Sequence, residues 1–337
     1  MLKHFIFTII FLLLPFSSQA ATIYLESDSQ EYHIGDEFRV DIMVDKVGEC
    51  FNTAEIEIDF PKDILNFINF SDGESLLSLW LEKPNSDNIQ EINKLGRLKF
   101  TGGIPGGYCG KIPGDPGVSN KLGAIFFKAK NVAEGVEISI DNQNSKILLN
   151  DGQGSFDNLK VKNLKLDILE ASSTSKNEWK ELLKKDKIPP EPFVVELRQN
   201  PNMFDGAYYI IFSTTDKQSG IDHYEVLEIK LEEQLGIKPK RSFWDIVLGR
   251  KKKTPKWEKV ESIPYKLKDQ SLESIIKVKA VDKAGNERVV EYVPPADKRP
   301  PKHSPFIDFK LSFLLIIGAV VLILVVVLLE RKQKRYK

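Results

Sequence analysis

Alternation of apolar and other residues in short runs is the main pattern along the first half of the chain. Every second residue is apolar from Phe38 to Val44 and again from Ala54 to Phe60, which is typical of a half-buried strand. The residues 62–67 favour one helical turn. Further short strands are predicted over 22–25, 98–101, 122–129, 137–140, 145–149 and 159–169. Many short strands separated by Gly and Asn/Asp clusters predict an antiparallel β-sandwich over 22–170.

A second strand-rich region is predicted over 191–293. Its strands are expected at 193–197, 207–213, 221–231, 275–281 and 288–292. The residues 171–190 between the two regions are rich in Ser, Lys and Pro, so we interpret them as a linker with a short helix over 176–185. Five prolines in 294–305 predict an extended stalk over 294–310.

The two ends of the chain are strongly apolar. Residues 1–20 combine a basic start, a short apolar run and small residues at Ser18 and Ala20, which indicates a secretory signal peptide; the alternative is an uncleaved N-terminal anchor. Residues 311–329 contain no charge and are long enough for one transmembrane helix, the alternative being a buried core helix. The tail 330–337 carries five basic residues, which favours a cytoplasmic C-terminus.

These features together predict an all-β ectodomain on the outside of the plasma membrane, held by a single C-terminal span. The net charge is zero, with an excess of acidic residues before residue 171 and an excess of basic residues after it. Because a nucleic-acid binder is not normally exported, we expect no nucleic-acid partner.

The chain has two cysteines, Cys50 and Cys109. In an exported protein an isolated pair predicts one disulfide. The alternative, a metal ligand or a nucleophilic thiol, would need nearby histidines or further cysteines, and the chain has few histidines.

Candidate catalytic chemistry is sparse. His33 and His223 lie in different regions beside turns or strands, and no set of nucleophile, base and orienting group stands out. We therefore expect a non-enzymatic protein with no cofactor and no committed metal site. Acidic residues near turns leave calcium open as an alternative to simple turn geometry. These residues are Asp216, Asp222 and Asp282 in the second region and Asp115 and Asp151 in the first.

Two sets of aromatic residues remain open in interpretation. The segment 238–257 mixes basic residues with Phe243, Trp244 and aliphatic residues. It either docks on an anionic surface as a short amphipathic helix or packs its apolar side chains on the sandwich. Trp80 and Tyr108 either stack on sugar rings or pack in the core.

The first region resembles the cohesin module. The similarity lies in a Gly-Asp turn before an alternating strand (residues 32–40), the strand and proline turn of 54–65, the strands 96–103 and 122–129, and the turn 149–154. The resemblance implies a jelly-roll sandwich that recognises a protein partner, as cohesins bind dockerin modules. Ala54 stands where the family usually has an acidic residue, so the sequence departs from the pattern there.

The resemblance also implies a binding surface on a sheet face. Ala54, Ile56 and Ile58 are expected to face the core. The opposite, outward face then holds the candidate binding residues Asn52, Glu55, Glu57, Asp59, Arg97 and Lys99. The alternative is that these cations and carboxylates only pair with each other across strands.

The second region resembles bacterial immunoglobulin-like or fibronectin type III modules. The residues 216–226 match a turn and strand of that family, and 278–286 match its penultimate strand and the following turn. The resemblance implies a spacer fold without chemistry of its own.

We therefore expect a cell-surface scaffold protein that presents a cohesin-like module for protein or carbohydrate recognition. A structural or adhesion role in the envelope without a discrete ligand is the alternative, followed by a carbohydrate-active enzyme. The expected partners are a surface or secreted protein, or a polysaccharide.

Overall fold

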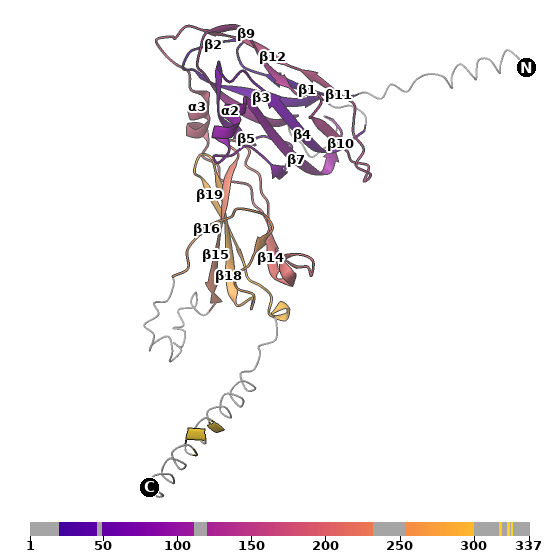
Figure 1. Ribbon diagram of the computed structural model, residues 1–337, viewed down its shortest axis with the longest axis vertical. Coiled ribbons are helices and arrows are strands. Elements are labelled where there is room, and N and C mark those ends of the chain that lie inside the picture. The colour runs from indigo at the N-terminus through magenta and orange to yellow at the C-terminus, as the bar shows by residue number, and fades with distance from the viewer. Residues whose placement is uncertain are drawn as a thin grey trace, which may run out of the picture. The chain divides into compact units, whose positions relative to one another are not determined.

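The computed structural model describes residues 20–45, 49–110, 120–231 and 254–299, and five residues between 317 and 325. Most of them belong to one compact unit, which runs to Gln270 and resumes from Ser274 to Val293. Two strand-rich regions lie within this unit, as the alternating pattern predicts (Figure 1).

One sheet of the first region has five strands. Its order is β11 (Leu159–Lys162), β1 (Ala21–Glu26), β3 (Glu37–Asp45), β8 (Lys121–Ala129) and β5 (Leu65–Ser71). The alternation expected for the strand at Phe38 is present, because burial alternates strictly along β3. β8 is buried at almost every position, since its outward residue Phe126 is covered by Trp179.

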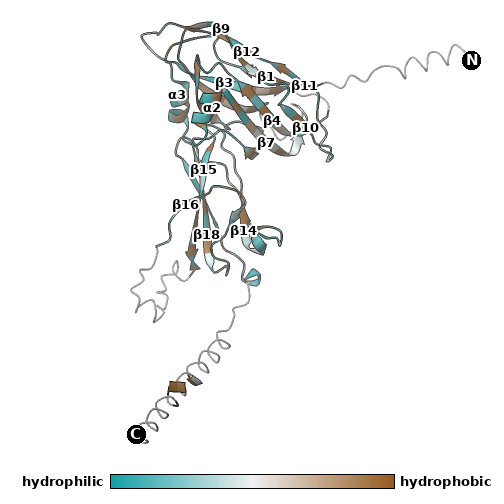
Figure 2. Cartoon of the chain, viewed as in Figure 1, coloured by the Kyte–Doolittle hydropathy of each residue, from teal (hydrophilic) through white to brown (hydrophobic). Residues whose placement is uncertain are grey.

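The other sheet has seven strands. Its order is β2 (Glu31–His33), β12 (Leu164–Leu169), β9 (Ala133–Ile140), β4 (Phe51–Asp59), β7 (Arg97–Tyr108) and β6 (Leu79–Glu82), and β10 (Lys146–Leu149) pairs with β4. The inner faces of the two sheets share one core of aromatic and branched side chains. Phe127 belongs to this core, and its ring lies near those of Phe38, Phe60 and Phe67, with centroids 6.1, 5.0 and 6.5 Å away. Figure 2 shows hydrophobic and hydrophilic residues mixed along these strands.

The first region differs from the sequence expectation in three ways. Two strand pairs are parallel, β1 with β11 and β12 with β2, so the sandwich is mixed and not wholly antiparallel. The helical turn expected over 62–67 is shorter than predicted: it covers 62–64, where the Leu65 N–H donates to the Pro61 carbonyl at 2.9 Å, and β5 begins at Leu65 because Leu65 and Phe67 are needed in the core. The helix α2 (Ile89–Leu95) was not foreseen.

The expected linker contains α3 (Glu178–Lys185), close to the predicted short helix. It is tied to the first region, since Trp179 packs on Phe126 with ring centroids 4.6 Å apart. The Arg39 backbone N–H donates to Glu178 Oε2 at 2.8 Å. The side chain of Asn177 caps the helix by accepting a hydrogen bond from the Lys180 N–H at 2.7 Å.

The second region contains two smaller sheets. One has three strands, β13 (Glu196–Gln199), β14 (Tyr208–Ile211) and β17 (Tyr265–Lys266). The other has four, β16 (Glu258–Lys259), β15 (Ile221–Lys230), β18 (Ser274–Asp282) and β19 (Glu287–Tyr292). Ile210, Val226 and Val278 are among the buried side chains of these two sheets.

The second compact unit comprises Ser271–Glu273 and the chain from Pro294 onward. It includes the single 3-10 turn η2 (Ala296–Lys298) and, further along, helical residues such as Leu322 and Ile323. Within the described chain no helix is both long enough and apolar enough to cross a membrane. The predicted signal peptide and most of the predicted span 311–329 lie outside the described residues.

Candidate functional site

The strand β4 carries the candidate binding residues as alternation predicts. Ala54, Ile56 and Ile58 are fully buried in the core. Glu55 and Glu57 therefore lie on the opposite, outward face of the seven-stranded sheet, because successive side chains of a strand point to opposite sides.

Asn52 interrupts this alternation because β4 has a register shift between Phe51 and Thr53. It follows buried Phe51 and precedes outward Thr53, and a bulge of this kind allows two neighbouring residues to lie on the same side. Its side-chain amide donates to Asn150 Oδ1 at 3.2 Å. Asn52 is therefore held at the bulge, near the start of the strand.

The charged candidates on β4 and β7 pair with each other. Lys99 Nζ lies 2.6 Å from Glu55 Oε1. Arg97 makes a bidentate contact with Asp59, with Nε to Oδ1 at 2.6 Å and Nη2 to Oδ2 at 3.1 Å. Arg97 Nη1 also lies 2.8 Å from Glu57 Oε1. The structure thus brings these five residues together and satisfies their charges within the sheet.

These ion pairs raise the pKa of both cations. The hydrogen bond to Glu55 is the main cause for the Lys99 ammonium, and the hydrogen bond to Asp59 is the main cause for the Arg97 guanidinium. Such exposed cross-strand pairs contribute from about 0.2 to 1 kcal/mol each. These ion pairs give the charged residues a structural role within the sheet. The outward face on which they lie stays open to solvent.

A row of less polar residues crosses the same face, and alternation along single strands did not predict it. Pairing places Leu148 opposite Thr53, Thr53 opposite Gly103, and Gly103 opposite Leu79, so these four residues share the outward side. An isolated bridge adds Phe156 beside Leu148. We call Phe156, Leu148, Thr53, Gly103 and Leu79 the apolar row. Its ends are well exposed, Phe156 by 62% and Leu79 by 47%.

The missed signal was local and weak. In β6 the residues Leu79, Trp80 and Leu81 are all apolar, so the sequence does not show which of them point outward, and a run of four residues is too short to distinguish from a loop. Trp80 is the inward residue, since its ring packs against Phe70 and Phe100 with centroids 5.7 and 6.0 Å away. Which residues neighbour Leu79 depends on strand pairing, which local alternation does not encode.

The cysteine pair forms the expected disulfide. Cys50 and Cys109 are bonded, and they are separated by 59 positions in sequence. Cys50 precedes β4 and Cys109 follows β7, so the bond closes the end of these two paired strands. Tyr108 beside it is buried with its ring 5.6 Å from that of Phe51, which supports the core interpretation over a sugar platform.

His33 and His223, the two histidines considered above, each contact a neighbouring carboxylate. His33 Nδ1 lies 3.7 Å from Asp36 Oδ2, and His223 Nδ1 lies 2.6 Å from Asp222 Oδ2. Each contact joins residues within three positions in sequence, which is a local turn or strand arrangement.

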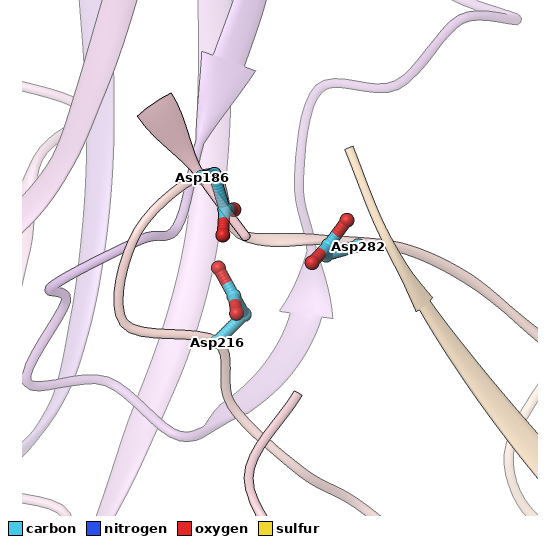
Figure 3. Close-up of side chains that lie close together, drawn as sticks. All are labelled: Asp186, Asp216 and Asp282. Carbon is cyan, nitrogen blue, oxygen red and sulfur yellow. The ribbon is translucent and has the colours of Figure 1, made fainter. Parts of the chain in front are cut away.

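A second site of interest is a cluster of three buried carboxylates in and near the second region (Figure 3). Asp186 follows α3 as its C-cap, Asp216 begins the turn before β15, and Asp282 ends β18. They are exposed by only 1%, 3% and 2%. One carboxylate oxygen from each lies within 4.8 Å of the others. We call Asp186, Asp216 and Asp282 the acidic cluster.

Hydrogen-bond donors orient these carboxylates. Asp186 Oδ2 accepts from the Ser219 N–H at 3.1 Å. Asp216 Oδ2 accepts from the Gln218 and Gly220 N–H groups at 3.0 and 2.9 Å. Both oxygens of Asp282 accept from Asn286, one from its backbone N–H and one from its side-chain amide, each at 2.8 Å.

The pKa values of two cluster members are raised. Burial is the main cause for Asp216, and the negative charges of Asp186 and Asp282 add to it. Burial is again the main cause for Asp282, with a further contribution from Asp186. No lysine, arginine or histidine within the described ranges forms an ion pair with any of the three.

The other sequence candidates have different places. Asp222, at the start of β15, is exposed. It contacts His223 and does not belong to the acidic cluster. Asp151 is exposed in a turn, and its pKa is lowered, chiefly by a hydrogen bond with Ser155. Asp115 and residues 238–253 of the basic aromatic segment lie outside the described residues. At the end of that segment, Lys279 Nζ lies 4.6 Å from the centre of the Trp257 ring.

Comparisons with known proteins give likenesses of structure to cohesin modules. The cohesin module of a family 33 glycoside hydrolase from Clostridium perfringens is 13% identical, with a TM-score of 0.34, over 45% of this chain and 98% of that one. A non-cellulosomal cohesin from the archaeon Archaeoglobus fulgidus is 15% identical, with a TM-score of 0.33, over 45% and 92%. A type I cohesin in a cohesin–dockerin complex from Clostridium thermocellum is 11% identical, with a TM-score of 0.34, over 45% and 100%. No family model and no curated protein matches the chain.

Proposed function

We propose that the first region is a non-enzymatic binding module that captures a protein partner on the outward face of β4 and its neighbours. The binding surface comprises the apolar row and the charged residues beside it, from Glu55 and Lys99 to Asp59 and Arg97. A dockerin-like module is the first candidate partner, because the sequence of this region resembles that of cohesins.

The observation that carries this proposal is the composition of the face. Phe156 and Leu79 expose apolar surface at the two ends of one row, and both signs of charge lie beside it. Protein interfaces characteristically combine an apolar centre with a polar rim. Gly103 in the middle of the row keeps the face flat, since it has no side chain.

A protein partner is favoured over a polysaccharide by the placement of the aromatic residues. Trp80 and Tyr108, the two candidates for stacking on sugar rings, pack against aromatic side chains of the first region. The exposed ring of Phe156 already has Lys146 Nζ 5.6 Å from its centre.

We propose further that the chain is exported and held at the plasma membrane, so that this module faces outward. The support is in the sequence: an apolar start that ends in small residues, and an uncharged segment 311–329 followed by basic residues. The main alternative remains a structural role in the envelope without a discrete ligand.

The test uses the full chain, purified in detergent and immobilised, to capture proteins from the envelope and secreted fractions of the source cells. Leu79→Asp with Phe156→Asp places charges at both exposed ends of the apolar row. We expect the affinity for the captured partner to fall at least tenfold, which corresponds to a loss of about 1.4 kcal/mol of binding free energy. Charge reversal at both Glu57 and Lys99 should likewise abolish capture.

Val132→Asp is the matched control, because Val132 is exposed by 45% and lies in the turn before β9, outside the apolar row. It should leave capture unchanged, and the melting temperatures of all variants should stay within a few degrees of the wild type. Unchanged capture by the face variants would refute the proposed surface. If the wild-type chain captures no protein, the structural role is favoured instead.

A further inference from the structure

The acidic cluster places three carboxylates in a space that water hardly reaches. Isolated buried charges are strongly unfavourable unless they are paired or bind a metal ion. Here the three groups face one another (Figure 3), and the described ion pairs include none of them. The hydrogen bonds from neighbouring N–H groups orient the carboxylates but do not cancel three like charges.

Asp216 provides a separate indication that a ligand is missing from this arrangement. Its Oδ2 accepts both of the hydrogen bonds that the side chain makes, from Gln218 and Gly220, and its Oδ1 has no donor among the described residues. The residue is nevertheless only 3% exposed. Figure 3 shows one of its oxygens directed at the carboxylate of Asp186. A carboxylate oxygen without a donor, on a residue so little exposed and beside another carboxylate, is stabilised by a positive partner.

The position of Asp186 increases the negative potential of the site. It is the C-cap of α3, where the helix macrodipole already presents partial negative charge. Helices normally place basic residues there, and α3 does so with Lys184 and Lys185 in its last turn. Asp186 itself instead turns a buried carboxylate toward the two others.

We propose that Asp186, Asp216 and Asp282 bind a calcium ion. All three side chains offer oxygen, the donor atom that Ca²⁺ prefers, whereas zinc sites favour nitrogen and sulfur. Ca²⁺–oxygen bonds are about 2.4 Å long, so two ligands of one ion lie at most about 4.8 Å apart. The cluster oxygens lie within 4.8 Å of one another. Mg²⁺ is a poorer fit because it demands near-ideal octahedral geometry and loses its water reluctantly, so a site made only of protein ligands suits it less well.

The ion would join three segments that are distant in sequence. Asp186 ends the helix that packs on the first region, Asp216 begins the turn that leads into β15, and Asp282 ends β18. Binding would therefore fasten the end of α3 to two turns of the second region. Because an ion that binds only the folded chain stabilises it by mass action, the melting temperature should depend on its concentration.

The test is a titration of CaCl₂ into the full chain, purified in detergent and freed of metal with EDTA. Calorimetry should detect one Ca²⁺ bound per chain, and the melting temperature should rise with calcium and rise less with the same concentration of MgCl₂. In the wild type, the amide NMR signals of Ser219, Gly220 and Asn286 should shift, because these N–H groups donate to the cluster. No binding at millimolar calcium, or shifts confined to other turns, would overturn the proposal.

The variant Asp216→Asn should change the melting temperature in opposite directions without calcium and with it. The asparagine oxygen can keep the two backbone hydrogen bonds, and its NH₂ group then replaces Oδ1, which has no donor among the described residues. In EDTA the variant should melt at or above the wild-type temperature, since one negative charge is removed. In calcium it should melt below the wild type and bind calcium at least tenfold more weakly.

The matched control is Asp222→Asn, because Asp222 is exposed at the start of β15, outside the cluster. Its calcium affinity should stay within twofold of the wild type. Equal loss of affinity in both variants would contradict the assignment. If Asp216→Asn does not fold, Asp282→Asn and the amide shifts of the wild type decide the question.

Discussion

Gly96 ends α2 at a position with no room for a side chain. Its φ of 74° is in the left-handed region, and its N–H donates to the Ile92 carbonyl at 2.8 Å. An added Cβ would lie 2.8 Å from the carbonyl oxygen of Phe60. Two physical demands, the helix end and the close approach of another segment, therefore meet at one residue.

Comparing Gly96→Ala with the same substitution at a second glycine separates these two demands. Gly135 has a similar φ of 61° but nothing within 4 Å of an added Cβ. Gly135→Ala should lower the free energy of unfolding by about 1 to 2 kcal/mol, the penalty of the left-handed conformation. Gly96→Ala should lower it further, because the Phe60 carbonyl must also move. Urea denaturation of both variants measures this, and equal losses would mean that the close contact is unimportant.

Alternation predicted well which side chains face the core where this depends only on positions along one strand. Ala54, Ile56 and Ile58 are buried as expected, and Glu55 and Glu57 lie outward. The apolar row was not predicted, because each of its members has its neighbours on other strands. For the acidic cluster, the sequence left calcium at Asp216, Asp222 and Asp282 open only as an alternative to turn geometry, whereas the structure places Asp216 and Asp282 together with Asp186 from the linker. Only the folded chain brings that residue close.

At the level of elements, the positions of the strands were predicted more reliably than which strands pair with each other. The expected strands at 38–44 and 122–129 correspond to β3 and β8, which pair with each other. The parallel pairs of β1 with β11 and β12 with β2 join segments that are far apart in sequence, which periodicity does not report. Periodicity likewise does not report that Trp179 of α3 packs on Phe126. This contact makes the linker a part of the packed structure.

The disulfide is the element-level feature with the clearest effect on stability. It joins two residues 59 positions apart, at the end of β4 and β7. The chain-entropy model assigns roughly 4 kcal/mol to a loop of that length, because the bond restricts the unfolded chain. Reduction should therefore lower the melting temperature of the first region and leave that of the second unchanged. Differential scanning calorimetry with and without reductant measures both.

The variant with Cys50→Ser and Cys109→Ser is the control for the reductant itself. It should melt like the reduced wild type and show no further response to reduction. A thiol titration of the untreated wild type should find no free thiol. Two free thiols per chain, or equal melting before and after reduction, would contradict the structural role of this bond.

For the whole molecule, the sequence predicted two strand-rich regions, and the described chain contains both. They belong to one compact unit, whereas Pro294 onward belongs to the other. How firmly the first region is held to the second depends on contacts of individual side chains. One example is Ser71, whose hydroxyl donates to the Ser219 carbonyl at 2.8 Å. Composition and periodicity do not reveal such contacts.

Membrane attachment is the prediction that concerns the whole chain. The segment 311–329 has no charged residue, and a helix of that length rises about 28 Å, close to the thickness of the hydrocarbon core. Basic residues follow it and favour the cytoplasmic side. Protease added to spheroplasts should therefore remove the chain between Ala21 and about Pro305 and leave a cytoplasmic marker protein intact. A chain that stops at Lys310 should be released into the medium, because it keeps the export signal and lacks the span. Full protection of the ectodomain, or retention of the shortened chain in the membrane, would show that the proposed topology is wrong.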